Sequence, residues 1–179
     1  MADIDAFASQ LLEEAKRFLE IAIVSGDNIR RDAHLHAALM LSFSALEAHV
    51  NAICDEFSKR PEFSIHEKGF LLEQEARLES GAFKLSGLKM SRLEDRIAFL
   101  HRHFSGNATY KQANWWSALG SAINLRNTLT HPKGIPAATE QATKSALAAI
   151  IDAIESLYQA IYKKPFPAAS RGLQSKLTF

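Results

Sequence analysis

The sequence predicts an all-α fold, an up-and-down antiparallel bundle of about five helices. Apolar residues recur at the spacing of amphipathic helices over most of the chain. Turn-forming residues, such as those at positions 25–28, separate the periodic segments, and short connections make neighbouring helices antiparallel. The composition, 47% apolar and 23% charged over 179 residues, is that of one globular domain with a sizeable core.

Two helices are expected in the first third of the chain. The first is capped by Asp3 or Asp5 and ends at the turn formed by residues 25–28. The second covers residues 29–59 and buries one apolar side. That side includes Cys54, which has no second cysteine for a disulfide or a zinc site, so we expect a buried thiol.

The middle of the chain has a weaker helical pattern. A short third helix is expected over residues 64–75, followed by an irregular connection over residues 81–90, which has no clear period. Ser91 and Glu94 have the spacing of a capping box, which predicts a helix that runs to about Phe104.

Two further helices complete the predicted bundle. The first begins near Asn114, after a loop at residues 110–113, and is stopped by Pro132. After a turn at residues 133–136, the final helix covers residues 138–163.

We therefore expect a helical domain over residues 1–164 and a tail over residues 165–179, either disordered or docked on a partner. The N-terminus lacks the features of a signal peptide, and no continuous apolar run approaches ~18 residues, so we expect no membrane contact and a cytoplasmic location. The net charge of +1 means that any nucleic-acid site must build its positive potential locally.

The chemistry of the chain is expected at the end of the fifth helix, where Arg126, Asn127, Thr130 and His131 precede Pro132. Arginine holds a phosphate through two parallel hydrogen bonds, and histidine can act as a general acid or base near neutral pH. On a helix, Arg126 shares a face with Thr130, and Asn127 shares a face with His131. The four residues converge only if the break at Pro132 turns His131 toward Arg126.

The presence of Arg126 and His131 at this helix end also has a purely structural explanation. Arginine and histidine near a helix C-terminus complement its dipole, and His-Pro-Lys-Gly is common at helix ends.

The segment from Arg126 to Pro132, in the penultimate helix of a helical chain, resembles the R-x4-6-H signature of the HEPN family, with Asn127 as the polar residue after the arginine. The long helix that contains Ser44–Asn51 is similar to an early helix of such domains. The resemblance implies a helical bundle that dimerises, so that two motifs share one cleft.

What the resemblance implies about function is metal-independent cleavage of RNA, in a toxin or phage-defence setting. His131 would move the proton of a ribose 2′-OH or of the leaving 5′-oxygen, Arg126 would hold the phosphate, and Asn127 would position either group. The implied partners are RNA, a second copy of the chain and an antitoxin protein.

Glu47 and Asn51 share one face of the second helix at i,i+4 spacing, and His49 lies off that face on the buried side. These two residues either form a solvated surface or reach the Arg126–His131 cleft as supporting groups, together with Thr130.

Other sites are not supported by the sequence. The pairs His34/His36 and His101/His103 have the wrong spacing for a metal chelate, so we expect surface or boundary histidines and neither a metal nor a cofactor. Trp115 and Trp116 fit a core or a dimer interface better than a base-stacking platform.

Two alternatives to the ribonuclease remain open. One is a non-catalytic HEPN-like module that binds RNA, a nucleotide or a partner protein, and the other is a structural helical dimer without a ligand. A basic rim around Arg126 would favour cleavage, and a motif buried under packed side chains would favour the structural dimer.

Overall fold

The computed structural model describes residues 2–106, 109–134 and 138–179, and this part of the chain is mostly helical, as predicted. It contains six α-helices, two short 3₁₀ helices and one two-stranded hairpin. The elements are α1 (Ala2–Val24), α2 (Asn28–Ser58), α3 (Ile65–Leu72), β1 (Gln74–Glu79), β2 (Ala82–Leu88), α4 (Leu93–Ser105), η1 (Thr109–Gln112), α5 (Asn114–Thr130), α6 (Glu140–Tyr162) and η2 (Ala169–Arg171).

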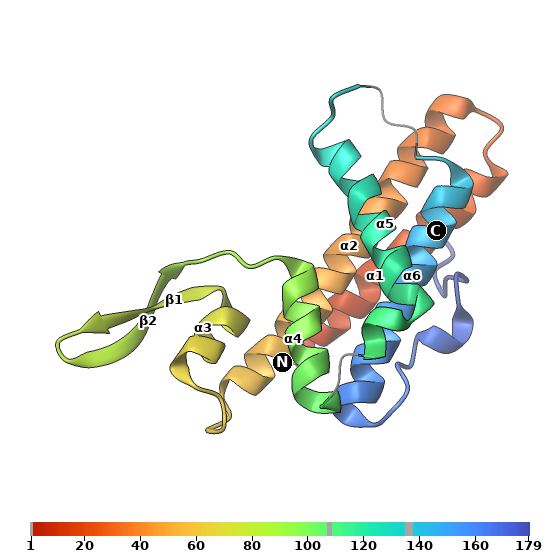
Figure 1. Ribbon diagram of the computed structural model, residues 1–179. Coiled ribbons are helices and arrows are strands. Elements are labelled where there is room, and N and C mark those ends of the chain that lie inside the picture. The colour runs from red at the N-terminus through yellow and green to blue at the C-terminus, as the bar shows by residue number, and fades with distance from the viewer. Residues whose placement is uncertain (1, 107–108, 135–137) are drawn as a thin grey trace.

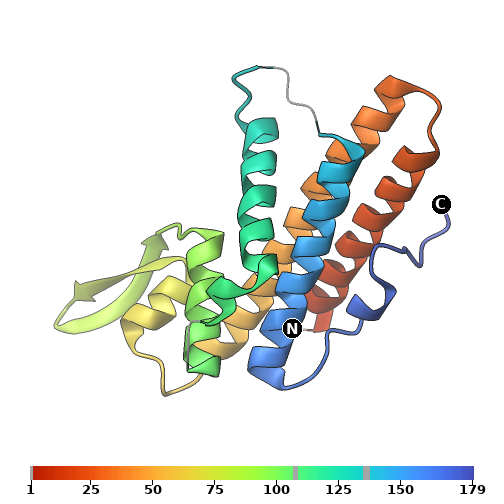
Figure 2. The same ribbon diagram turned by 45° about the vertical axis from the view of Figure 1, so that its right-hand side comes forward.

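The long helices α1, α2, α5 and α6 lie side by side, with α4 packed against α6 (Figures 1 and 2). Helix α6 contacts α1, α2, α4 and α5, and its apolar stripe of Leu147, Ile150, Ile154 and Leu157 is fully buried. In contrast, the hairpin projects away from these helices, and α3 lies between the hairpin and the end of α2 (Figure 1). We refer to residues 65–88 as the arm.

Helix α2 supplies much of the core. Its small residues Ala38 and Ala45 are fully buried and allow close contact with neighbouring helices, and Cys54 is buried as predicted. By length and composition, α2 could span a membrane, with an 18-residue window of mean hydropathy 1.4. However, 61% of that window is buried inside the protein, which is the pattern of a core helix.

The hairpin replaces what we predicted as the end of a helix and an irregular connection. Ser80 and Gly81 both have positive φ, 51° and 81°, and they form a two-residue turn between the paired residues Glu79 and Ala82. Two positive φ values at a two-residue turn match the twist of the adjoining strands. The third helix therefore ends at Leu72, and residues 74–79 and 82–88 are extended strands.

Two predicted helix caps are wrong. Helix α1 begins at Ala2, so neither Asp3 nor Asp5 can cap it. Helix α4 has Arg92 at its N-cap position, and the backbone N–H of Ser91 donates instead to Glu73.

The capping box of this chain is at α3. Ser64 and Glu67 bond each other's backbone there, and this arrangement fixes the first turn of the arm. The turn predicted between α5 and α6 is only partly described, because residues 135–137 lie outside the described residues. Asn107, which follows α4, also lies outside them.

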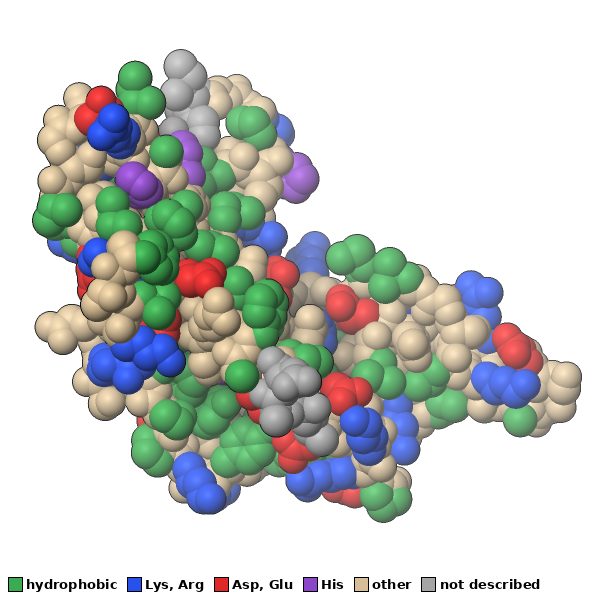
Figure 3. Space-filling view, turned by 180° about the vertical axis from the view of Figure 1, so that it is seen from behind, with side chains coloured by type: hydrophobic (Ala, Val, Ile, Leu, Met, Phe, Trp, Pro, Cys, Tyr) green, Lys and Arg blue, Asp and Glu red, His purple; other side chains and the backbone are tan. Residues whose placement is uncertain are grey.

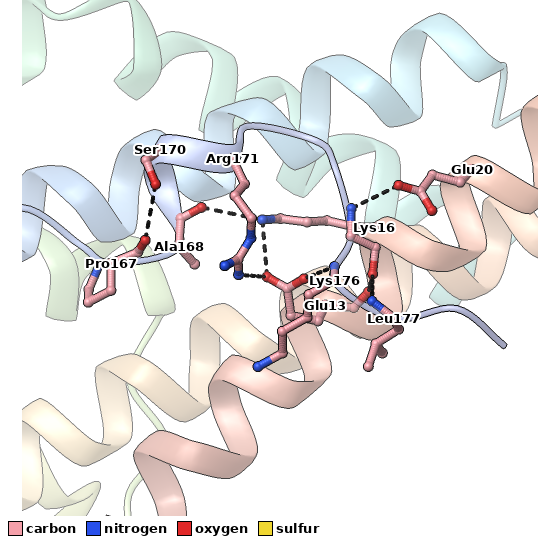
Figure 4. Close-up of polar contacts among 10 residues, drawn as sticks. Glu13, Lys16, Glu20, Pro167, Ala168, Ser170, Arg171, Lys176 and Leu177 are labelled. Atoms are coloured by element: carbon pink, nitrogen blue, oxygen red, sulfur yellow. Dashed lines mark hydrogen bonds and ion pairs between the residues drawn. The ribbon is translucent and has the colours of Figure 1, made fainter.

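The tail was predicted to be disordered or bound to a partner, but it packs on its own chain (Figure 4). Phe166 is buried, and the Glu13 carboxylate on α1 accepts hydrogen bonds from Arg171 at 2.6 Å and from the backbone of Lys176 at 2.7 Å. Burial alone would raise the pKa of Glu13, but these bonds hold it below its usual value. The tail thus adds hydrogen bonds to a buried carboxylate that otherwise pairs with Lys16, at 3.4 Å on the same helix.

Candidate functional site

A cleft of about 560 Å³ opens where the arm meets the long helices. The face seen in Figure 3 is hollowed between the arm and the upper helical ends. Helices α2, α4 and α5 contribute most of its lining, and Glu73 and Met90 add residues from the two ends of the hairpin segment. Four of the residues predicted as a site line this cleft, namely Glu47, Asn51, Arg126 and Asn127.

Arg126 has the geometry of a cation that can accept an anion. Its guanidinium lies over the Phe43 ring, 5.1 Å from the centroid, and this contact supports one face of the group. Its ion pair with Glu47 is loose, with 3.9 Å between Nη2 and Oε1. Within the described part of the chain, its buried Nε atom has no hydrogen-bond partner. The guanidinium is thus held in place by the ring and is only loosely paired.

Amide side chains surround Arg126 in the cleft. Asn51 comes from α2, and Asn124 and Asn127 lie one turn apart on α5. All three residues are exposed, and none of their side-chain amides has a hydrogen bond among the described residues. An amide offers both a donor and an acceptor, so these groups can contact phosphate oxygens, sugar hydroxyls or base edges.

His131 lies beyond the helical part of α5 and does not line the cleft. It is the C-cap residue, with φ −131° and ψ 63°, and its backbone N–H donates to the Asn127 carbonyl at 2.9 Å. Its side chain is exposed. The proline break thus takes His131 out of helical geometry, as predicted, but one chain does not bring it into the cleft with Arg126.

Thr130 is also outside the cleft lining. Its hydroxyl donates to the backbone carbonyls of Arg126 and Asn127, at 3.3 and 3.4 Å. These are bonds within the last turn of α5, so in this structure Thr130 acts on the helix end and not on the cleft.

The charge of the cleft is balanced. Three arginines and three glutamates line it. Arg96 is buried and is committed to the fold, because it donates to the Leu71 carbonyl and pairs with Glu73 at 3.4 Å. Arg92 is exposed and has no ion pair among the described residues. An anion in the cleft would therefore be met by Arg126 and Arg92.

Sequence reasoning missed Asn124, Arg92, Arg96 and Glu94. Two signals were available. Asn124 lies three residues before Asn127, on the same side of the helix. Arg96 interrupts the apolar pattern of α4 directly before the buried Ile97, and an arginine on a buried side normally has carboxylate or carbonyl partners.

The other histidines differ in their surroundings. His34 and His36 are half-buried and His103 is exposed, but His101 is buried, contrary to prediction. Its Nε2 lies 3.1 Å from the Ser156 hydroxyl, and its ring stacks on Tyr110. In the residues described, no three His, Cys, Asp or Glu side chains are grouped so that they could hold a metal ion.

No protein-family model, no curated protein and no solved structure matches this chain. A function must therefore be argued from the cleft and from the resemblance of the Arg126–Pro132 segment.

Proposed function

We propose that this chain is a metal-independent endoribonuclease that binds RNA phosphate through Arg126 and moves protons through His131. The observation that carries the proposal is the guanidinium of Arg126, which lies over Phe43, is loosely paired and shares the cleft with three asparagine side chains. The resemblance of the segment around it to the HEPN motif supplies the type of reaction.

The reaction is an internal phosphoryl transfer. The ribose 2′-oxygen loses its proton to a base and attacks the adjacent phosphorus, and the bond from phosphorus to the 5′-oxygen breaks. The leaving 5′-oxygen takes a proton from an acid, which gives a 2′,3′-cyclic phosphate and a 5′-hydroxyl. Arg126 would stabilise the charge that develops on the phosphoryl oxygens, and Asn127 would orient the phosphate.

A second copy of the chain would complete the site. His131 does not line the cleft of its own chain, so the Arg126 cleft needs a histidine from elsewhere. An exposed His131 could instead reach the Arg126 cleft of a partner subunit. In this proposal the enzyme is a homodimer of helical bundles, located in the cytoplasm, with an antitoxin protein as a further partner.

The test of catalysis is the variant His131→Ala. We expect it to abolish cleavage of single-stranded RNA while the helical circular dichroism is unchanged, because an alanine cannot transfer a proton. EDTA should leave the parent activity unchanged. Full cleavage by the alanine variant, or a requirement for added Mg²⁺, would contradict the mechanism.

A non-catalytic RNA-binding module is the second candidate, and one observation favours it. His131 lies away from the cleft in the single chain, so the cleft has binding groups without a nearby proton donor. This candidate predicts RNA binding that depends on Arg126, with no cleavage by the parent chain.

A further inference from the structure

Another cavity lies between α1, α6 and the tail. Its volume is about 280 Å³, near the lower end of the roughly 300–1,000 Å³ that small-molecule sites occupy. The residues that line it are Ser9, Glu13, Tyr158, Phe166, Pro167, Ala168, Arg171 and Lys176. None of these residues lines the Arg126 cleft, so the two sites are separate. We refer to this space as the tail cavity.

We propose that the tail cavity binds a small organic anion. The charged head, a phosphate or a carboxylate, would lie beside Arg171 and Lys176, and an apolar body would lie against Tyr158 and Phe166. The proposal concerns a different site from the RNA cleft and does not depend on the proposed function. Two features of the cavity carry it, namely an excess of positive charge and aromatic walls.

Positive charge exceeds negative charge around the tail cavity. The Lys16 ammonium contacts Glu13 and the Ala168 carbonyl, which both line the cavity, and Arg171 donates to the same carboxylate (Figure 4). Lys176 gives Glu13 only its backbone N–H, and its ammonium has no ion pair within the residues that the structure describes. One carboxylate thus lies among three cationic side chains.

The Lys16 ammonium is poorly satisfied for a fully buried charge. Its two contacts are both 3.4 Å long, beyond the roughly 2.7–3.2 Å of ordinary N–H···O hydrogen bonds, and an ammonium has three donors. Glu20 on the same helix does not offset the excess, because it already pairs with Arg17 at 3.1 Å. Since buried charge is costly without compensation, an anion in the adjacent cavity would supply the missing negative charge.

The aromatic walls indicate that the anion carries an apolar group. Phe166 is buried and Tyr158 is half-buried, with their ring centroids 5.0 Å apart, and the Tyr158 ring also packs edge-on against His49. Rings that are already fixed lose little freedom when a ligand covers them. A benzene ring fits a cavity of about 150 Å³, so one ring and a charged head fit in the tail cavity.

The first experiment compares Lys176→Gln with Lys164→Gln. Both substitutions remove one exposed positive charge after α6, but Lys164 does not line the cavity. The probes are phenyl phosphate, benzoate, inorganic phosphate and phenol, and calorimetry measures their binding to the full chain. We expect the parent and Lys164→Gln to bind at least one of the two aromatic anions about tenfold more tightly than inorganic phosphate or phenol, and Lys176→Gln to lose about five- to tenfold of that affinity.

The comparison of the two aromatic anions identifies the head group. Tighter binding of phenyl phosphate than of benzoate would assign a phosphate, whose two charges offset the excess more fully, and the reverse order would assign a carboxylate. In either case the bound anion should slow hydrogen exchange in residues 166–179, because the tail forms one wall of the cavity.

The second experiment fills the cavity. Ser9→Phe and Gln10→Phe each add a ring to α1, but Gln10 is exposed and does not line the cavity. Ser9→Phe should lose binding of both aromatic anions by at least about tenfold, whereas Gln10→Phe should bind them like the parent. Circular dichroism checks that both variants fold.

The outcomes separate this inference from the proposed function. Arg126→Ala should bind phenyl phosphate like the parent, and a loss of binding there would mean that the RNA cleft holds the anion and that the tail cavity does not. The proposal also fails if the parent binds neither aromatic anion, if Lys176→Gln matches Lys164→Gln, or if a folded Ser9→Phe binds like the parent. Each of these results is independent of whether the chain cleaves RNA.

Discussion

At the scale of single residues, the proposed chemistry depends on the shape of the Arg126 side chain as well as its charge. A guanidinium presents parallel N–H donors to two phosphate oxygens, and its flat face can stay on the Phe43 ring while it does so. Lysine keeps the charge but has neither feature. Because the cleft also holds three carboxylates, charge alone gives a weak attraction there.

Arg126→Lys should therefore retain more RNA binding than cleavage. We expect activity to fall by at least 100-fold, which corresponds to roughly 3 kcal/mol of transition-state stabilisation, with a much smaller change in affinity. Arg126→Ala should lose both. The measurements are single-turnover cleavage and binding of a non-cleavable oligonucleotide. Equal cleavage by the parent and both variants would assign Arg126 a purely structural role at the helix end.

His49 should make the stability of the fold depend on pH. Burial lowers its pKa to about 4, from 6.5 in a model peptide, and neither ring nitrogen has a hydrogen-bond partner within the described part of the chain. The unfolded chain then binds this proton more readily than the folded one. The stabilisation is therefore complete above pH 6.5 and is lost as the pH falls toward 4.

For His49 alone, this linkage amounts to about 2 kcal/mol between pH 7 and pH 5. The variant His49→Phe keeps an aromatic ring against Tyr158 and Phe166 but cannot titrate. Urea unfolding at the two pH values should show a smaller loss of stability for the variant than for the parent. Part of the pH dependence should remain, because burial also lowers the pKa of His101 to about 4. Equal losses in both proteins would contradict this account.

At the scale of elements, periodicity predicts the long helices well and the arm poorly. Helices α2 and α5 begin and end within about two residues of their predicted bounds, because each carries many apolar residues at one spacing and a clear stop signal. The arm offers short segments in which helical and extended patterns compete. Its decisive signal is Ser80-Gly81, a turn dipeptide between the apolar pair Leu78 and Phe83, which face each other across the hairpin.

Two helical glycines give opposite predictions for substitution by alanine. At Gly69 in α3, a Cβ would lie 2.7 Å from the backbone oxygen of Gln74 and 3.2 Å from Leu85, so α3 packs on the hairpin through this glycine. We expect Gly69→Ala to cost about 1–3 kcal/mol through overpacking. Gly120→Ala in α5 meets no atom and should stabilise the helix by about 0.5–1 kcal/mol.

Thermal unfolding should therefore show a lower Tm for Gly69→Ala and a slightly higher Tm for Gly120→Ala than for the parent. Limited proteolysis adds a local measurement, since loosening of α3 against the strands should increase cleavage within residues 65–88. A Tm for Gly69→Ala equal to or above that of the parent would mean that the close contact at Gly69 is not rigid.

At the scale of the whole molecule, the candidate site shows why a single sequence predicts only part of a cleft. The pattern around Arg126 marks one helix end, and the spacing of Glu47 and Asn51 marks one helix face. Nothing in either segment indicates that the other lies opposite. The tail shows the same limit, because Arg171 and Ser175 bond to Glu13, more than 150 residues earlier in the chain.

The assembly of the enzyme can be tested by mixing two inactive chains. A two-fold axis places the same patch of each subunit against itself, so a dimer formed across the α5 ends would present the His131 of one chain to the Arg126 cleft of the other. Each site would then take its arginine from one chain and its histidine from the other. Chains that carry Arg126→Ala and His131→Ala would each be inactive alone but would complement each other when mixed.

Refolding the two variants together in equal amounts should restore about a quarter of the parent activity, since about half of the dimers are mixed and each mixed dimer has one intact site of two. Light scattering should give twice the chain mass of 19.8 kDa for the active species. If arginine and histidine instead act within one chain, no mixed dimer contains an intact site and the mixture stays inactive. Full activity in a monomer would exclude the shared site directly, and His131 would then have to reach Arg126 through a rearrangement of the α5 end.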